Sequence, residues 1–303
     1  MTPVRLSVRG IGAPVNPPSS VETARADTEE SLSHAVEILH GKTFVAVTGA
    51  GLSTDSGIPD YRGEGAPRNH PMSIQEFLSS EERRRRYWLG SHMGWVSFHS
   101  ASPNLGHRAL AHAEKLGLST GVITQNVDGL HQDAGSLRVV DLHGRLDRVA
   151  CLKCGQSYSR PEIARQIEQL NPWVERESLS GVVQPDGDVA VEVSERFVVP
   201  SCDLCGGMLK PQVVFFGEFV PPTVFQDAMA LLSSADVLVV AGSSLVVNTG
   251  VRFVNAAKKR EMPIVVINRG PTRADSAATV RIEGGTSPTL QALVAALSSS
   301  EVH

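Results

Sequence analysis

The chain has 303 residues, is 41% hydrophobic and carries a formal net charge of −4. A chain of this length can bury a substantial core, and it divides naturally into one large α/β domain and a smaller module. The negative charge argues against the broad basic surface of a nucleic-acid-binding protein, and apolar stretches end well before the roughly 18 residues of a membrane-spanning helix.

We predict that the first 25 residues form a disordered tail ahead of the folded part. Pro14, Pro17 and Pro18 oppose the amphipathic helix of a transit peptide, and the segment lacks the apolar centre of a secretory signal. We therefore expect a cytoplasmic protein, with the mitochondrial matrix as the alternative for a eukaryotic source. Apolar residues at helical spacing then predict a helix over 28–39.

A buried strand over 42–48 runs into a glycine-rich turn that begins Gly49-Ala50-Gly51-Leu52-Ser53-Thr54. Such a turn followed by a helix start is typical of anion sites, because main-chain N–H groups and the positive end of the helix dipole face a phosphate. The pattern lacks the third glycine of hydride-transferring dehydrogenases and the Gly-Lys-Ser/Thr of a P-loop. It therefore indicates a nucleotide site, with a plain turn between packed elements as the alternative.

Residues 62–103 are rich in helix formers and poor in strand signals. We interpret them as a helical insertion in the nucleotide domain, with helices over 72–78 and 81–99 and a mobile loop over 63–70. A further helix over 104–116 has Asn104 as its cap.

Four later strands, over 120–124, 138–142, 235–241 and 263–267, alternate with helices over 222–232, 250–259 and 288–297. This alternation predicts an α/β fold with a doubly wound, mainly parallel, Rossmann-like sheet. Ligands of such sheets bind at the carboxyl ends of the strands. The residues that follow these strands are small or polar and can bond phosphate, ribose or amide groups: Gln125, Asn126, Asp128, His143, Gly242, Ser243, Ser244, Asn268, Arg269 and Gly270.

Two Cys-x-x-Cys pairs, Cys151 with Cys154 and Cys202 with Cys205, predict a structural zinc site. Four thiolates complete a tetrahedral site and leave no open position for catalysis. The gap between the pairs is longer than in an ordinary zinc ribbon, which indicates a folded insert with a helix over 160–173 and a loop or hairpin over 180–194. We expect this small module to lose its fold without metal.

His143 is the candidate general base. It follows a buried strand and lies close in sequence to the zinc module, which places it in the crevice between the two domains. Imidazole titrates near neutral pH and can accept a proton without a large pKa shift. We expect the other histidines near this edge, His107 and His131, to cap or pack.

Seven motifs in order resemble the sirtuins, the NAD-dependent protein-lysine deacylases, over residues 30–300. They are GAGLSTDSGIPDYR, TQNVDGLH, DLHG, CLKC with CDLC, FFGE, GSSL and INRGPTRAD. Tyr61, the Asn-Pro-Trp at 171–173 and the run at 270–275 look most like the class II branch. The resemblance implies a Rossmann-like NAD domain over 26–149 and 209–303, and a zinc module over 150–208.

The resemblance also implies which residues bind NAD. The turn residues are Gly49, Ala50, Gly51, Thr54, Asp60, Tyr61 and Arg62. Gln125 and His143 would contact the nicotinamide ribose, and Gly242, Ser243, Ser244, Asn268, Arg269 and Gly270 the adenosine half. The nicotinamide pocket would consist of Ile58, Asn126 and Asp128. His143, with Asn126 as the second catalytic residue, would activate the ribose hydroxyl that takes over the acyl group, so that nicotinamide and O-acyl-ADP-ribose are released.

The acyl-lysine substrate of this family enters as a peptide strand. By resemblance, the peptide would lie between Val247 on one side and the segment Val214, Phe215, Phe216, Gly217 and Glu218 on the other, although the two phenylalanines could equally be core residues. No Tyr-x-x-Arg pair of the branch selective for succinyl or malonyl groups follows Gly63, so we expect acidic acyl groups to be disfavoured. We also expect a monomer with no nucleic-acid or membrane partner. A protein mono-ADP-ribosyltransferase on the same fold, and a zinc-bearing binding module, are the alternative functions.

Overall fold

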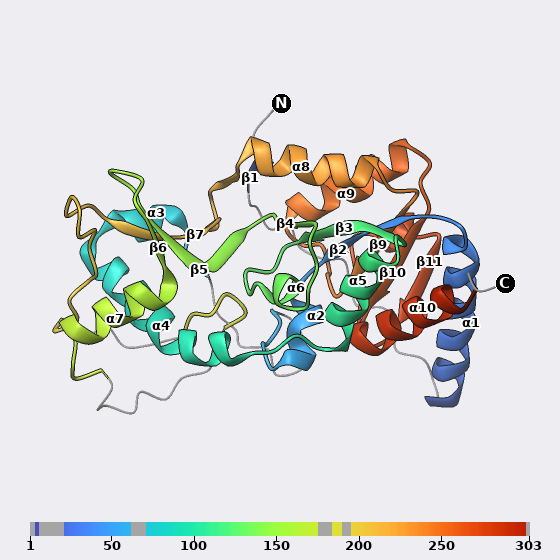
Figure 1. The fold of residues 1–303 in the computed structure, drawn as a ribbon, viewed down its shortest axis with the longest axis horizontal. Helices are drawn as coiled ribbons and strands as arrows, with labels where there is room; N and C mark the ends of the chain where they lie inside the picture. The colour runs from blue at the N-terminus through green and yellow to red at the C-terminus, as the bar shows by residue number, and fades with distance from the viewer. Residues whose placement is uncertain (1–3, 6–20, 62–70, 175–183, 190–194, 301–303) are drawn as a thin grey trace.

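The computed structural model describes residues 4–5, 21–61, 71–174, 184–189 and 195–300. These residues form two lobes along the long axis of the molecule (Figure 1). A large lobe is built on a six-stranded sheet, and a small lobe on a three-stranded sheet. Within the described part of the chain, no helix combines the length and apolar character that crossing a membrane requires.

The large sheet is entirely parallel and has the strand order β11-β10-β9-β2-β3-β4. Its strands are β2 (Phe44–Thr48), β3 (Ser119–Thr124), β4 (Val139–Asp141), β9 (Val237–Ala241), β10 (Ile264–Asn268) and β11 (Val280–Glu283). The chain winds outward from β2 to β4 and then restarts beside β2 with β9. This is the order of a Rossmann sheet, and its switch point lies between β2 and β9, where ligands bind.

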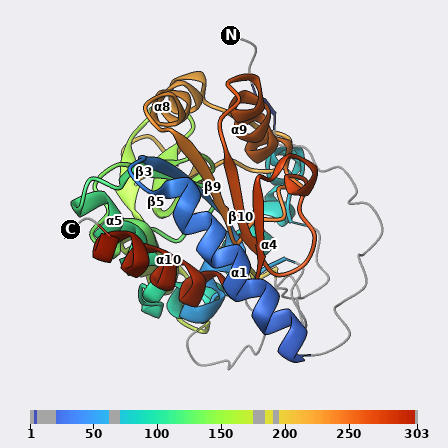
Figure 2. The ribbon, with the colours of Figure 1, turned by 90° about the vertical axis from the view of Figure 1, so that its right-hand side faces the viewer.

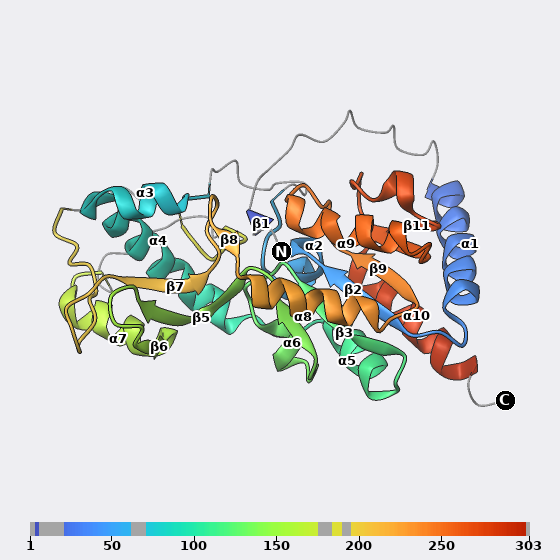
Figure 3. The ribbon, with the colours of Figure 1, turned by 90° about the horizontal axis from the view of Figure 1, so that it is seen from above.

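Helices cover both faces of this sheet. The helices α1 (Val21–Leu39), α5 (Leu105–Lys115) and α10 (Thr286–Ser300) lie on one face, and α8 (Pro222–Ser233) and α9 (Asn248–Lys259) on the other (Figures 2 and 3). Alternate strand residues supply the two cores: Phe44 and Ala46 pack toward the first group, whereas Val45 and Val47 pack toward the second. The predicted α/β doubly wound fold is confirmed.

The small lobe has an antiparallel sheet of order β6-β5-β7. Its strands are β5 (Gly144–Cys151), β6 (Ser157–Ser159) and β7 (Leu209–Val213), and its helices are α3 (Ile74–Ser79), α4 (Glu81–Ser100) and α7 (Arg160–Leu170). Phe77 and Trp88 of the predicted helical insertion share one buried cluster with Val149, Ile167 and Cys202. The insertion and the cysteine-bearing segment therefore pack as one unit.

Several observed elements differ from those expected. The strand β11 and the small sheet were not predicted, because polar residues interrupt the apolar pattern of their strands. Two elements include residues of the predicted disordered tail. Helix α1 begins there at Val21, and β1 (Val4–Arg5) pairs with the distant strand β8 (Phe219–Val220). The rest of that tail, the loop over 63–70 and most of the loop or hairpin over 180–194 lie outside the described residues. Short elements complete the fold: α2 (Ala50–Ser53), α6 (Leu130–Asp133) and the 3₁₀ turns Thr54–Ser56 and Asp275–Ala277.

Candidate active site

The glycine-rich turn leaves β2 at the switch point of the sheet and packs against the turn that follows β9. The N–H of Gly51 donates to the carbonyl oxygen of Gly242, with an N···O distance of 2.9 Å, and the N–H of Gly49 donates to that of Ala241. A Cβ atom on Gly49 would lie 2.7 Å from that of Ser243. These glycines are therefore required because two main-chain turns pack closely together. The sequence had suggested a different reason, the close approach of the main chain to a phosphate.

Gln125 connects the ends of three strands. Its side-chain amide donates to the hydroxyl of Ser243 at 2.7 Å and to the main-chain carbonyl oxygen of Thr48 at 3.3 Å. The main-chain carbonyl oxygen of Gln125 is 2.9 Å from Nδ1 of His143. Gln125 follows β3, and Ser243 follows β9, so the bond between their side chains crosses the switch point.

A chain of hydrogen bonds runs from Asn126 to Asp128. Nδ2 of Asn126 donates to the carbonyl oxygen of Gly49 and to the hydroxyl of Ser53, which donates to a carboxylate oxygen of Asp128 at 2.7 Å. The main-chain N–H of Leu130 also donates to Asp128. Burial raises the pKa of Asp128, and these two hydrogen bonds oppose that rise. The chain fixes the orientation of the Asn126 side chain.

His143 has one ring nitrogen engaged and one without a partner. Nδ1 lies 2.9 Å from the carbonyl oxygen of Gln125, so Nδ1 carries the proton and donates it to that oxygen. Nε2 is buried and has no hydrogen-bond partner among the described residues. Burial lowers the pKa of His143 to about 4. The ring is therefore neutral at pH 7, with Nε2 as a free proton acceptor.

A cavity of about 850 Å³ brings most of the predicted site residues together. Small-molecule sites commonly enclose roughly 300–1,000 Å³. The predicted residues that line it are Gly49, Ala50, Gly51, Thr54, Asp60, Tyr61, Gln125, Asn126, His143, Val214, Phe215, Phe216, Gly242, Ser243, Ser244, Val247, Asn268, Arg269 and Gly270.

Four predicted residues do not line the cavity, and a fifth cannot be placed. Asp128 lies behind Ser53, and Ile58 is buried among Phe98, Leu130 and Leu146. Gly217 and Glu218 also lie outside the lining, while Arg62 falls outside the described residues.

The cavity has lining residues that sequence reasoning missed. Gly285 and Thr286 follow β11, and the glycine pair at 284–285 was the signal that could have located them. Tyr87 comes from α4, and Asp186 and Asp188 come from the segment between the cysteine pairs. Nothing local marks these three residues, because only the packing of the small lobe brings them to the site.

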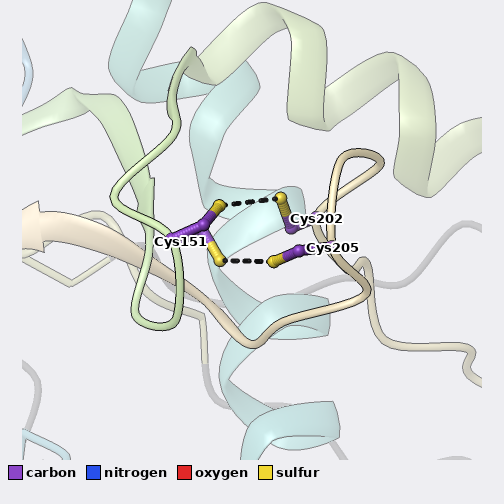
Figure 4. A group of neighbouring side chains, drawn as sticks. Cys151, Cys202 and Cys205 are labelled. Atoms are coloured by element: carbon purple, nitrogen blue, oxygen red, sulfur yellow. Dashed lines mark hydrogen bonds between the residues drawn. The ribbon is translucent and has the colours of Figure 1, made fainter.

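The four cysteines come from two loops of the small lobe, and their sulfur atoms all lie within 4.8 Å of one another. Figure 4 shows Cys151 of the first loop opposite Cys202 and Cys205 of the second. The Sγ atoms of Cys151 and Cys205 are 3.5 Å apart, and those of Cys154 and Cys202 are 3.7 Å apart. Tetrahedral zinc with bonds of about 2.3 Å places its sulfur ligands roughly 3.8 Å apart. The cluster thus has the ligand set and spacing of a closed structural zinc site.

Comparison with known proteins places this geometry in a family. Residues 49–249 match the model of the Sir2 family. The chain is 48% identical over 271 residues to NAD-dependent protein deacetylase 1 of Mycobacterium avium, covering 88% of this chain and 96% of the relative. It is 42% identical over 271 residues to the NAD-dependent protein deacylase SIR4 of Monosiga brevicollis, covering 88% of each.

Solved structures agree with this placement. A structure described as Sir2 with a p53 peptide and NAD+ superimposes with a TM-score of 0.71 at 29% identity, and the match covers 90% of this chain and 99% of the other. Sir2Tm bound to a propionylated peptide gives a TM-score of 0.70 at 29% identity with the same coverage. The fold is therefore shared over most of the chain.

Proposed function

The chain belongs to the Sir2 family, the sirtuins, and on that premise we propose that it is an NAD-dependent protein-lysine deacylase. The activities of its relatives support this assignment. The observation that carries it is His143, which lines a cavity at the switch point of a Rossmann sheet and whose buried Nε2 has no hydrogen-bond partner among the described residues. Such an atom is suited to accept a proton from a bound sugar hydroxyl.

The residues at the switch point fit a dinucleotide. When bound, NAD would supply nicotinamide as the leaving group and ADP-ribose as the acceptor of the acyl group. Gly49, Ala50, Gly51 and Thr54 would hold the phosphates, and the predicted residues after β9 and β10 the adenosine half. Because the N–H groups of Gly49 and Gly51 already donate within the protein, phosphate binding falls to the remaining donors of the turn.

His143 serves as the base because its tautomer is fixed. The carbonyl oxygen of Gln125 holds the proton on Nδ1, which leaves Nε2 able to accept one from a ribose hydroxyl. The lowered pKa keeps the free ring neutral at physiological pH. The hydrogen bonds to Gly49 and Ser53 orient the amide of Asn126, and Asp128 acts on that amide through Ser53.

For the substrate, we infer an acyl-lysine peptide bound as an added strand. The segment from Val214 to Phe216 and Val247 both line the cavity, which supports a peptide path between them. The relatives crystallised with a p53 peptide and with a propionylated peptide support the same substrate class.

Finer assignments are part of this proposal. We place the chain in the class II branch on Tyr61, the Asn-Pro-Trp at 171–173 and the run at 270–275. We retain the division into a tail over 1–25, an NAD domain over 26–149 and 209–303 with an insertion over 62–103, and a zinc module over 150–208. A cytoplasmic monomer without a nucleic-acid or membrane partner also remains a prediction.

The test is release of nicotinamide with an acetyl-lysine peptide, compared with the same peptide bearing free lysine. We expect release only with the acylated peptide, and O-acetyl-ADP-ribose in equal amount. His143→Ala should abolish release, whereas His34→Ala, an exposed position on α1, should not. With labelled NAD, label that stays on protein would instead indicate the ADP-ribosyltransferase. Release that is independent of any peptide would contradict the proposal.

A further inference from the structure

Lys210 is a buried cation behind the wall of the cavity. It lies in β7, is 9% exposed and is absent from the cavity lining. A buried ammonium group is unfavourable unless it is paired and hydrogen-bonded. Burial lowers the pKa of Lys210, and Glu218 opposes that effect. The side chain is therefore retained at a position where an apolar residue would be the ordinary choice.

Among the described residues, the partners of the Lys210 ammonium group all belong to the next eight residues of the chain. Nζ lies 2.9 Å from a carboxylate oxygen of Glu218 and donates to the carbonyl oxygens of Val213 at 2.7 Å and Pro211 at 3.3 Å. It also lies 4.8 Å from the ring centroid of Phe215. The ammonium group thus joins the end of β7 to the loop that follows it.

Glu218 completes this arrangement from the other end of the loop. The carboxylate oxygen that meets Lys210 also accepts the N–H of Phe215 at 2.8 Å. The N–H of Glu218 in turn donates to the carbonyl oxygen of Phe215 at 3.0 Å. The Glu218 side chain, predicted from the sequence to bind substrate, is thus occupied within the protein.

The same loop is bonded to the catalytic histidine. The N–H of Val214 donates to the main-chain carbonyl oxygen of His143, with an N···O distance of 2.7 Å. Lys210 holds the residue before Val214, and Glu218 holds the residue after it. Val213, Val214 and Phe215 all line the cavity. Three successive main-chain groups of the wall are therefore fixed, one of them by His143 itself.

We propose that the Lys210–Glu218 ion pair is a positioning device that holds the peptide-binding wall in register with His143. The proposal rests on the deacylase function above. Neither residue contacts the reacting groups, so each acts through the main chain of Val213 to Phe215. Binding of the acyl-peptide should therefore depend on the pair much more strongly than binding of NAD does.

Steady-state kinetics with an acetyl-lysine peptide and NAD test this dependence. Lys210→Met leaves the Glu218 carboxylate without its cation, and we expect the KM for peptide to rise about tenfold. The KM for NAD should stay within about twofold of the wild-type value, because the switch point is untouched. The matched control is Lys258→Met, at an exposed position in the last turn of α9, which should change neither constant.

The double variant Lys210→Met/Glu218→Gln separates positioning from general stability. It removes both charges together but keeps an amide oxygen to accept the N–H of Phe215, so we expect it to recover most of the lost peptide affinity. Should Lys210→Met fail to fold, Glu218→Gln alone should still raise the KM for peptide, because it leaves the buried ammonium group unpaired.

Amide hydrogen exchange provides a readout that does not need catalysis. In Lys210→Met, the amides of Val214 and Phe215 should exchange faster, and exchange in β2 and β9 should be unchanged. The inference would be overturned if Lys210→Met changed neither the KM for peptide nor the exchange rates. It would also be overturned if the KM values for peptide and NAD rose equally and the double variant did not restore them. A wild-type protein inactive on every acyl-peptide, but with the expected exchange pattern, would overturn the proposed function instead.

Discussion

Gly51 and Gly242 face each other across the switch point so closely that neither tolerates a side chain. A Cβ atom on Gly51 would lie 2.9 Å from the carbonyl oxygen of Gly242, which also accepts the N–H of Gly51. Gly242 has a φ of 64° and its own Cβ would lie 2.4 Å from the main-chain nitrogen of Leu52. The contact sets the spacing of the two turns, to which we assign dinucleotide binding.

The first prediction is that Gly51→Ala weakens both the fold and NAD binding. The added methyl meets main chain, which cannot rotate away, so we expect the free energy of unfolding to fall by about 1–3 kcal/mol. The two turns should also move apart, and the KM for NAD should rise. Urea unfolding and kinetics with varied NAD measure the two effects.

Gly284→Ala is the matched control for that substitution. Its Cβ would be 3.4 Å from the nearest atom, an ordinary contact, and it lies beyond the same edge of the sheet. If the Gly51→Ala protein were as stable and as active as Gly284→Ala, the contact between Gly51 and Gly242 would not set the spacing of the turns.

Sequence reasoning brought together the residues at the switch-point half of the candidate site, because the rule that places them is local. Except for β11, the strands of the large sheet lie in short, mainly apolar runs, and the polar residues just after them can be read directly, as with Gln125, His143 and Ser243. All three line the cavity. The reason for the glycines was not readable, because it depends on the neighbour of Gly51 in space, Gly242.

The small-lobe half of the site was largely hidden for the same reason. Asp186 and Asp188 line the cavity only because their segment packs on α4, and no local pattern in that segment marks it as part of a site. The one available signal lay elsewhere, in Gly90 and Gly94. Glycines inside a helix are unfavourable, so two of them four residues apart indicate close approach of another main chain.

The second prediction concerns this packing. A Cβ on Gly94 would lie 2.0 Å from the carbonyl oxygen of Gly187. Gly94→Ala should therefore displace Pro185 to Asp188 from the cavity wall. We expect a wider cavity, and so a higher kcat/KM for a long-chain acyl-peptide relative to an acetyl-peptide. Parallel assays with the two peptides measure this ratio.

Val96→Ala is the control on the same helix, since Val96 is 71% exposed. It should leave the ratio of the two kcat/KM values unchanged. An unchanged ratio in Gly94→Ala would mean that the wall formed by Pro185 to Asp188 does not contact the acyl chain.

The third prediction is that zinc removal destabilises the small lobe and inactivates the enzyme without zinc acting in catalysis. The cysteine loops share a core with Phe77 and Trp88, and the same lobe supplies Tyr87 and Phe215 to the cavity. Cys202→Ser should abolish metal binding, lower the melting temperature and lower activity in parallel.

Elemental analysis should find one zinc per wild-type chain and none in Cys202→Ser. Leu204→Ser is a matched control in the same loop, because Leu204 is 70% exposed and offers no ligand. The predicted structural role would be wrong if a metal-free protein kept full activity and its original melting temperature.

The fourth prediction follows from two buried histidines beneath the glycine-rich turn. Nε2 of His131 lies 2.9 Å from the hydroxyl oxygen of Thr48. The rings of His131 and His107 meet edge to face, with 4.9 Å between their centroids. Burial lowers the pKa of His107 to about 4 and that of His131 well below its ordinary value, where the neighbouring His107 adds to the effect. Both rings are neutral in the folded protein at pH 5.

An unfolded histidine binds its proton near pH 6.5, whereas folded His107 binds one only near pH 4. Between these values the unfolded state holds more protons, so stability falls as the pH falls. For His107 alone the loss at pH 5 is about 2 kcal/mol. Urea unfolding at pH 7.5 and pH 5 should therefore show a smaller acid-induced loss in His107→Gln than in the wild type. The exposed variant His34→Gln should follow the wild type, and an equal loss in all three proteins would show that His107 protonates in the folded state as readily as in the unfolded chain.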